Sequence, residues 1–385
     1  MRVLMGHNYY QLAGGEDESF AAESALLESH GHEVIRYTLS NQTIGDEAGV
    51  RVAARAIWSQ ESYRELRELI RSTKPDVAHF QNTFPLISPS AYYAVKREGV
   101  PVVQSVRNYR LACLSANFYR DGRPCEDCRD KLIPWPGVVH NCYRGSRGAS
   151  GAVAAMLVTH RAIRTWSRMV DVYVAMTEFA RTKLVRQLPA ARTVVKPNFV
   201  FPDPGAGTGS GGYAVFVGRL SPEKGLETLL EAWRRVGDRL PLRIIGQGPL
   251  ADRVEQASRQ IPGVSWLGQL PIEETYDQIG DALLLVLPSR WYETFGRVAI
   301  EAFAKGTPVV ASDIGAVAEI MRGSEAGRLF AAGDADDLRR QVSEVVESGD
   351  LAAMRRRARR CFEREYTGEA NYHQLLKIYA LATGA

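Results

Sequence analysis

The sequence predicts an α/β protein of two domains, each built around a parallel β-sheet. Three observations predict this fold class. Short runs rich in β-branched and aliphatic residues recur along the 385 residues, with longer amphipathic stretches between them, which is the βαβ pattern of parallel sheets. A segment rich in Gly and Pro divides these runs into two sets. The length itself favours about two domains.

Ten runs are expected to form strands. They are residues 2–5, 33–39, 76–81, 101–106, 171–176, 214–217, 242–245, 265–267, 283–287 and 308–312. Residues 223–236 illustrate the helical stretches, because their apolar side chains recur at three- and four-residue spacing on one face. Ser221 and Pro222 before them suit a helix N-cap and first turn.

The segment PDPGAGTGSGG, residues 202–212, has the composition of a flexible linker or long loop. We expect the domain boundary close to it, with a first domain of residues 1–195 and a second of residues 196–365. Two such domains would face each other across a cleft. The carboxyl ends of parallel strands, where these folds bind ligands, would then point towards the cleft.

Composition and charge exclude several classes of protein. The 48 basic and 44 acidic residues leave a net charge of +4, which is too balanced for wholesale nucleic-acid binding. The N-terminus MRVLMGHNYY lacks the basic and apolar regions of a signal peptide, and no apolar run approaches the roughly 18 residues of a spanning helix. We therefore expect a cytoplasmic protein that binds no nucleic acid.

Two glutamates flank a glycine in WYETFGRVAIE, residues 291–301. In one continuous helix Glu293 and Glu301 would lie about 12 Å apart, too far to act on one bond as a glycosidase pair. That separation suits the two ends of an extended ligand, with the amides of Thr294, Phe295 and Gly296 facing an anion between them. A nucleotide diphosphate sugar has this layout. The other interpretation is that both acids are solvated residues of a first helical turn.

Further candidates follow other strands. Arg219 and Lys224 come just after one strand, where two cations would clamp a diphosphate without a metal, unless they are ordinary surface residues. Gly246 and Gly248 would let the backbone approach a ligand, or would simply form a turn. The same two interpretations apply to the pair Gly14 and Gly15 near the N-terminus.

Together these segments resemble the retaining family 4 glycosyltransferases of the GT-B fold. The matching segments are GGED at 14–17, DVAHFQN at 76–82, VRNYRLAC at 106–113, KPNFV at 196–200, FVGRLSPEKG at 216–225, IIGQGPL at 244–250 and the E-x7-E element at 288–312. The resemblance implies two Rossmann-like domains facing a central cleft, the first for the acceptor and the second for a UDP- or GDP-linked sugar donor. It also implies a C-terminal helix within 366–385 that crosses back to the first domain.

The resemblance also implies roles for residues. Glu301 would bind the ribose hydroxyls, and Glu293 with the amides of residues 294–296 would hold the sugar and phosphates. Arg219 and Lys224 would neutralise the leaving diphosphate. Attack from the face that the diphosphate leaves needs positioning and charge stabilisation more than a protein nucleophile, so we expect neither a cofactor nor a metal in catalysis.

The acceptor side departs from the family pattern. The family often has a histidine after its fourth strand, where this sequence has Arg107, followed by Asn108. Arginine cannot act as a base at neutral pH, but it can hold an acidic acceptor or a phosphate. His79 would line the cleft, or would be a structural histidine at a strand end. We expect a sugar, a lipid-linked molecule or another small molecule as acceptor.

Four of the five cysteines cluster as C-x11-C-x2-C-x13-C within an insertion of about residues 113–142. Cys113, Cys125, Cys128 and Cys142 would form a structural zinc site of four thiolates, or remain unligated thiols. Four protein ligands leave no open position for catalysis.

Two basic segments invite other interpretations. Residues 143–170 hold arginines and no acid, and as an amphipathic helix they would suit an anionic membrane, for instance the inner membrane face. The run at 355–360, RRRARR, would suit nucleic acid. A solvated helix face is the alternative for both. Asp334 and Asp336 match a D-x-D metal signature, but we interpret Asp334 as a helix N-cap.

Other functions are compatible with the same fold, some of them enzymatic and one without catalysis. A phosphorylase or a sugar-nucleotide epimerase would use the same fold. A catalytically silent module would bind a nucleotide sugar or glycan, although the set of acids and cations argues against it. A dehydrogenase is disfavoured, because no strand is followed by a convincing G-x-G-x-x-G.

Overall fold

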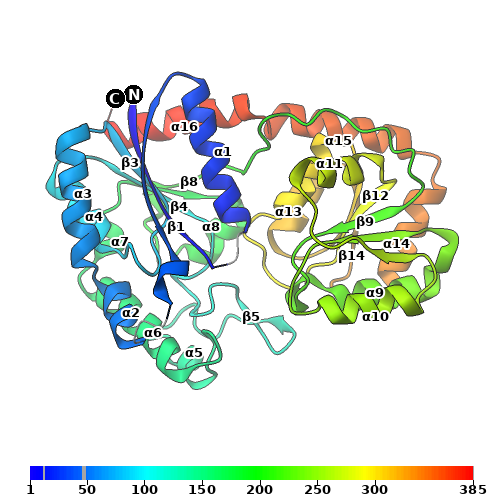
Figure 1. The fold of residues 1–385 in the computed structure, drawn as a ribbon, viewed down its shortest axis with the longest axis horizontal. Coiled ribbons are helices and arrows are strands. Elements are labelled where there is room, and N and C mark those ends of the chain that lie inside the picture. The colour runs from blue at the N-terminus through cyan, green and yellow to red at the C-terminus, as the bar shows by residue number, and fades with distance from the viewer. Residues whose placement is uncertain (12–13, 46–48, 385) are drawn as a thin grey trace. The chain divides into compact units, whose positions relative to one another are not determined.

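A computed structural model describes residues 1–11, 14–45 and 49–384. It divides into two compact units, each with a six-stranded parallel sheet. The first unit is Met1–Phe118, Cys125–Pro197 and Asn371–Ala385, and the second is Tyr119–Pro124 and Asn198–Ala370. The prediction of two parallel α/β domains is confirmed (Figure 1).

In the first unit the strands lie in the order β2-β1-β3-β4-β7-β8. They are β1 Arg2–Tyr9, β2 Glu33–Ser40, β3 Val77–Asn82, β4 Val102–Val106, β7 Val172–Ala175 and β8 Thr193–Val195. The helices are α1 Gly15–Ser29, α2 Gly49–Ile57, α3 Gln60–Thr73, α4 Ser90–Arg97, α5 Trp135–Val139, α6 Arg147–Ala162, α7 Thr165–Arg168 and α8 Glu178–Leu184, with 3-10 turns at Asn41–Ile44 and Ala190–Arg192.

The second unit has the strand order β11-β10-β9-β12-β13-β14. Its strands are β9 Ala214–Val217, β10 Leu242–Ile245, β11 Val264–Trp266, β12 Leu284–Leu287, β13 Val309–Ser312 and β14 Gly327–Phe330, and a hairpin of β5 Tyr119–Arg120 and β6 Arg123–Pro124 groups with it. The helices are α9 Leu226–Val236, α10 Ala251–Gln260, α11 Ile272–Asp281, α12 Arg297–Ala304, α13 Gly315–Ser324, α14 Ala335–Glu347 and α15 Leu351–Glu365, with 3-10 turns at Pro222–Lys224 and Gly237–Arg239.

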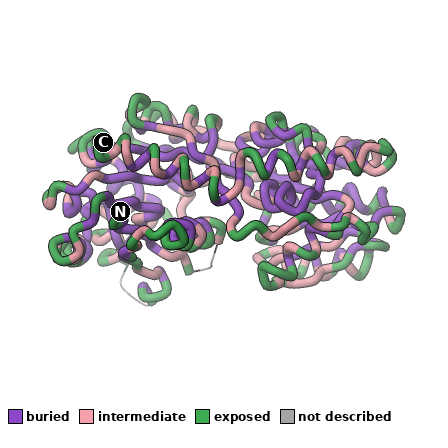
Figure 2. The backbone as a smooth tube through the Cα atoms, turned by 90° about the horizontal axis from the view of Figure 1, so that it is seen from above, coloured by how far each residue is buried: buried purple, intermediate pink, exposed green. Residues whose placement is uncertain are grey.

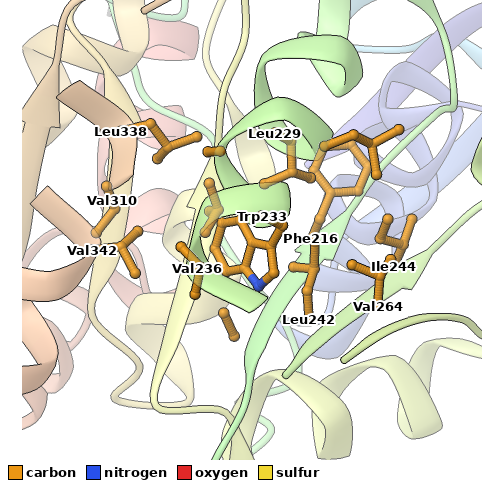
Figure 3. Close-up of a cluster of buried hydrophobic side chains, with 14 of the residues drawn as sticks. Phe216, Leu229, Trp233, Val236, Leu242, Ile244, Val264, Val310, Leu338 and Val342 are labelled. Atoms are coloured by element: carbon orange, nitrogen blue, oxygen red, sulfur yellow. The ribbon is translucent and has the colours of Figure 1, made fainter. Parts of the chain in front are cut away.

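Buried backbone forms the interior of each unit, and the exposed stretches lie outside it (Figure 2). In the second unit α9 lies at the centre of the core (Figure 3). Its apolar side chains share one buried cluster with side chains of β9, β10, β12, β13 and α14. Trp233 is fully buried, and its indole Nε1 donates to the carbonyl of Leu240 at 2.9 Å. The apolar face expected for this helix is therefore the face that it buries.

The start of α9 differs from the expectation. The helix begins at Leu226, because Gly225 has a left-handed backbone (φ 74°) that ends the preceding 3-10 turn. Ser221 precedes that turn, and its hydroxyl bonds the carboxylate of Glu223 rather than a backbone amide.

The segment expected to be a flexible linker or a long loop is a loop bound to the second unit. The amides of Gly207, Gly209 and Gly211 donate to the carbonyls of Lys305, Gly280 and Asp281. The guanidinium of Arg355 donates to the carbonyls of Gly207 and Gly280 as well. The glycines serve this close packing, since a Cβ on Gly207 would lie 2.3 Å from the backbone of Gly280.

The C-terminal helix α16, Gly368–Thr383, belongs to the first unit from Asn371 onwards. The ring of Tyr372 stacks on that of His30 with centroids 3.7 Å apart. The hydroxyl of Tyr379 lies 3.0 Å from Nδ1 of His79. The chain therefore completes the first unit with its last residues, after it has built the second.

Candidate functional site

The second unit brings two predicted site residues together at the carboxyl edge of its sheet. Lys224 follows β9 and Glu293 follows β12, and these strands are neighbours although they are far apart in the sequence. The strand order reverses between them, which is the topological switch point where open parallel sheets bind ligands. In such sheets the connections leave the two strands in opposite directions, and a crevice between them is expected.

Lys224 and Glu293 form an ion pair with 2.9 Å between Nζ and Oε1. The hydroxyl of Ser289 also donates to Glu293, and Nζ of Lys224 lies 5.4 Å from the ring centre of Trp291. Burial tends to raise the pKa of Glu293, but the charge of Lys224 and the hydrogen bonds from Ser289 and Lys224 outweigh it and lower that pKa. The glutamate is therefore an ionised hydrogen-bond acceptor at neutral pH.

The position of Lys224 depends on the glycine that follows it. A Cβ on Gly225 would lie 1.8 Å from the carbonyl oxygen of Pro288. The amide of Arg290 donates to the carbonyl of Glu223 at 2.8 Å, so the loops after β9 and β12 are joined by their backbones. The lysine is held beside the glutamate by main-chain packing as well as by charge.

Glu301 lies on α12, but Glu293 does not. Helix α12 begins at Arg297, and Gly296 is its N-cap with φ 89°. The interpretation of residues 293–301 as one continuous helix is therefore wrong. The Nε of Arg297 donates to Oε1 of Glu301 at 2.8 Å, one turn along the helix. Both glutamates are buried, at 6% exposure each.

The remaining residues of the predicted donor set have different environments. Arg219 is exposed just after β9. Gly246 and Gly248 have φ of 138° and 157°, and a Cβ on either would meet the backbone of Gly218 or Leu220 within 2.5 Å. Contact between the loops after β9 and β10 thus explains these two glycines, whereas their contact with a ligand stays a prediction.

Gly14 and Gly15 form the N-terminus of α1. Gly14 is the N-cap in an extended conformation, and its amide donates to the carboxylate of Asp17 at 3.0 Å. A Cβ added to either glycine would meet nothing within 4 Å. Open space therefore lies beside them, in contrast to the crowded glycines of the second unit.

The first unit has a cavity of about 590 Å³, its open mouth included, at the carboxyl ends of β3 and β4. Arg107, Asn108 and Arg110 line it, and among its described lining residues none is Asp or Glu. Aromatic side chains form much of its wall: Phe84, Tyr92, Trp166 and Tyr173. The cavity thus combines aromatic and apolar side chains with two arginines.

Arg110 lies over an aromatic ring. Its guanidinium carbon is 4.0 Å from the centre of Phe84 and 5.2 Å from that of Tyr143, within the range of cation–π attraction. Nearby, the amide of Asn108 donates to Glu16 at 3.2 Å. Burial raises the pKa of Glu16, and the hydrogen bond from Asn108 and the surrounding cations do not fully offset it.

Arg107 belongs to a buried network that the sequence did not reveal. Its NH2 lies 3.6 Å from Glu23, and its Nε donates to Gln81, which donates to Glu23 in turn. Nζ of Lys196 lies 2.9 Å from the other carboxylate oxygen of Glu23 and 3.2 Å from the amide oxygen of Asn371 on α16. The network joins β3, β4, α1 and the C-terminal helix.

His79 is fully buried and does not line the cavity. Its two ring nitrogens contact the hydroxyls of Tyr379 and Ser105 at 3.0 and 2.8 Å. Burial lowers the pKa of His79 to about 4; Glu23 opposes this change, and Lys196 and Arg107 add to it. The ring is therefore neutral at pH 7 and ties the sheet to α16.

None of the four clustered cysteines forms a disulfide. Burial raises the pKa of Cys128 to about 12, and Cys113, Cys142 and Cys125 add to this effect. Across residues 1–11, 14–45 and 49–384, no group of three or more His, Cys, Asp or Glu side chains is arranged to hold a metal ion. The thiols as placed do not form a tetrahedral set, and a structural zinc there stays a prediction.

The other singled-out segments mostly have structural contacts. Asp334 caps α14 by accepting from the amides of Asp336 and Asp337, which confirms its interpretation. In the run at 355–360, Arg355 binds four backbone carbonyls and Arg359 pairs with Asp203. Within the part of the chain that the structure describes, no helix is long and apolar enough to cross a membrane.

Some residues of the two sites escaped the sequence analysis. Ser289 and Arg297 contact the two glutamates, and their signal was their place inside the segment PSRWYETFGRVAIE. Glu23 and Lys196 gave no local signal, because their partners lie far away in the sequence. Only their burial in the structure identifies Glu23 and Lys196 as members of the network.

Comparisons with known proteins identify the family. A family model described as glycosyl transferase 4-like domain matches residues 14–198, and one described as glycosyl transferases group 1 matches residues 208–361. A phosphatidyl-myo-inositol mannosyltransferase of Mycolicibacterium smegmatis is 30% identical over 177 residues, 44% of this chain and 45% of that protein. A glycogen synthase of Mycobacterium tuberculosis is 36% identical over 156 residues, 39% and 37% of the two chains. The matched region thus spans less than half the length of these curated relatives.

Solved structures share the fold over the whole chain. A sucrose-phosphate synthase from Thermosynechococcus elongatus has a TM-score of 0.72 at 16% identity, covering 98% of both chains. Anabaena HepE, solved in complex with UDP, has a TM-score of 0.70 at 15% identity, covering 98% of this chain and 99% of that one. With the two family models covering most of its length, the chain belongs to the family 4 glycosyltransferases of the GT-B fold.

Proposed function

We propose that this protein transfers a sugar from a nucleotide diphosphate sugar to an acceptor, with retention of the anomeric configuration and without a divalent metal. The observation that carries the proposal is the pair of Lys224 and Glu293 at the switch point of the second sheet, with the exposed Arg219 nearby along the chain. Cations beside the carboxyl ends of strands β9 and β12 would take the place of a metal on the leaving diphosphate.

The two glutamates suit a donor with two polar ends. Glu293 is ionised, so it accepts hydrogen bonds from sugar hydroxyls and does not act as a general acid. Glu301 uses Oε1 for Arg297, and a carboxylate has further lone pairs with which it would accept from the ribose hydroxyls. Gly14 and Gly15 lie in the first unit with open space beside them, and their contact with the donor stays a prediction.

UDP is the carrier that we expect first. Anabaena HepE was solved with UDP and with UDP-glucose, and its fold resembles this one throughout. GDP is the alternative, and the sugar itself is open.

We place the acceptor in the cavity of the first unit, where Arg110 supplies a cation, Asn108 an amide, and aromatic rings part of the wall. Arg107 also lines the cavity, but Glu23 already balances its charge. This set favours an acceptor that carries a phosphate or another acidic group on a sugar or lipid body. His79 is left out of this proposal, because both of its nitrogens have protein partners.

Ligand-induced thermal stabilisation tests the donor site. We would measure melting temperatures of the wild type, Glu301→Ala and the control Glu347→Ala, an exposed residue of α14, with a panel of nucleoside diphosphates and nucleotide sugars. A ligand at a hundred times its dissociation constant adds about 2.7 kcal/mol. We expect one nucleotide to stabilise the wild type and the control, and Glu301→Ala to lose the response.

Transfer assays with the identified donor test the chemistry. Product formation in the presence of EDTA, and the anomeric configuration of the product by NMR, test metal independence and retention. If the nucleotide sugar binds but no acceptor is ever glycosylated and Glu293→Ala changes no activity, the proposal fails and a silent binding module takes its place. If the donor alone is converted, the protein is an epimerase.

A further inference from the structure

A short segment of the first unit exposes an unusual set of apolar side chains. Leu132, Ile133, Trp135 and Val139 are 74%, 53%, 55% and 51% exposed, all within eight residues around α5. We call these four residues the apolar rim. Elsewhere in the described chain, large exposed hydrophobic residues occur singly or far apart in sequence, as Val185 and Ile272 do. Scattered residues need no explanation, but a contiguous group does.

The backbone under the apolar rim is fixed. Arg161 on α6 donates to the carbonyls of Lys131 and Leu132 at 3.0 and 2.7 Å. Gly137 packs so closely on Leu114 that a Cβ would lie 2.7 Å from it. Helix α5 lies beside α6 at the margin of the first unit (Figure 1). The apolar side chains are therefore held outwards by an ordered segment.

The chain from Lys131 to Val170, which includes the apolar rim, carries charge of one sign. Residues 131–170 contain six Lys and Arg residues and no Asp or Glu. Nζ of Lys131 lies 5.5 Å from the ring centre of Trp135, and Arg144 and Arg147 are exposed between α5 and the start of α6. The nearest preceding acid, Asp130, pairs with Arg186 at 3.3 Å.

We propose that the apolar rim binds the surface of an anionic lipid bilayer. Trp and Leu side chains partition into the interface between headgroups and acyl chains, and neighbouring Lys and Arg side chains attract anionic headgroups. A segment that combines both, with no carboxylate over forty residues, matches this chemistry better than it matches a protein partner, whose core contact would be poor in Lys.

The sequence suggested a membrane contact at residues 143–170, whereas the structure favours the apolar rim at residues 132–139. On α6 the apolar residues Val153, Met156 and Leu157 are buried in the first unit, and Arg161 is occupied with backbone carbonyls. The membrane-facing apolar side chains therefore come from α5 and the loop before it, while α6 supports them.

The test is co-sedimentation of the full chain with phosphatidylcholine vesicles and with vesicles of phosphatidylcholine and phosphatidylglycerol. We expect binding to the anionic vesicles, weakened by salt, and little binding to the neutral ones. L132E/I133E/W135E should reduce the partition coefficient about tenfold or more, and R144E/R147E should reduce it less. The control V185E/I272E changes two apolar residues outside the rim, 52% and 41% exposed, and should bind as the wild type does.

Circular dichroism and the nucleotide-induced melting shift verify that each variant is folded, so this result is independent of the donor site. The proposal is overturned if the triple variant binds anionic vesicles as well as the wild type, or if the wild type binds neither kind of vesicle. Sedimentation velocity adds a third arm: a dimer that the triple variant converts to a monomer, without vesicle binding, would make the apolar rim a contact between copies of this chain.

Discussion

Both units have charged side chains near the carboxyl ends of their strands, but these side chains differ in how far they are exposed to solvent. In the first unit Glu23, Lys196 and Arg107 are enclosed, at 0%, 1% and 6% exposure. In the second unit Lys224 and Arg219 reach solvent, and only the carboxylate of the pair is buried. Breaking an enclosed network is costly because a buried charge loses its partner, whereas a half-open pair can exchange its partner for a ligand.

The strand orders differ in a corresponding way. The second sheet reverses between β9 and β12, each of which supplies one member of the pair. The first sheet reverses between β1 and β3, and its network joins residues near the ends of β3, β4 and β8. The comparison predicts that changes to the first network act mainly on stability and that changes to the second pair act mainly on ligands.

The largest effect should come from Glu23→Gln. Removing one partner of a buried ionic group leaves Lys196 without its counter-charge, which costs about 3–5 kcal/mol of unfolding free energy. Urea denaturation measures this loss. The control Glu28→Gln breaks an exposed pair with Arg36 and should cost less than about 1 kcal/mol. Equal losses in the two variants would remove the distinction between the units.

The same carboxylate predicts a pH dependence. Burial tends to raise the pKa of Glu23, but the charges of Lys196, His79 and Arg107 lower it from 4.5 to about 2. A pKa that is lower in the folded chain contributes stability above about pH 4.5, and this is lost as the pH falls towards 2. Denaturation of the wild type and Glu23→Gln across pH 2–6 should show a smaller dependence in the variant.

Lys224→Ala should lower transfer activity about 100-fold or more, because it removes a cation from the proposed leaving diphosphate. It should also raise the pKa of Glu293, since burial then acts with less opposition. The rate with a saturating donor measures the first effect. Lys96→Ala, which breaks a pair with Asp171 in the first unit, should leave the rate unchanged; a similar loss there would indicate a general effect of lost charge.

Gly225→Ala should cost about 2–4 kcal/mol of stability, because the new Cβ would overlap the carbonyl of Pro288 in a left-handed conformation. Gly14→Ala has open space around it and should cost only what an alanine costs at a helix N-cap, up to about 1 kcal/mol. Melting temperatures decide between them. If Gly14→Ala nevertheless weakens nucleotide binding, its space serves the ligand.

The smallest effect should be that of Tyr379→Phe. Loss of its hydroxyl leaves His79 with one partner fewer in a buried site, which costs about 1 kcal/mol. Tyr372→Phe, on the same helix as Tyr379, removes a partly buried contact with His32 and should cost less, because water replaces that partner. A greater loss in Tyr372→Phe would mean that α16 is anchored at its other end.

The strands that the sequence analysis missed are informative. The ten expected runs correspond to ten strands of the two sheets, and the last strand of each sheet, β8 and β14, was not expected. Both are short edge strands with partly exposed residues such as Val194 and Arg328. A long apolar run is needed only where both faces of a strand are covered, so edge strands give a weak signal.

The sequence by itself determined the fold class, the family and the donor residues Arg219, Lys224, Glu293 and Glu301 as candidates, because these features depend on local patterns and short motifs. Only the tertiary structure decided that Lys224 meets Glu293, that Arg107 is held by Glu23, and that α5 exposes its apolar residues. Strand order and packing create these contacts between residues that are distant in the sequence, and no local pattern records which distant residue will be the partner.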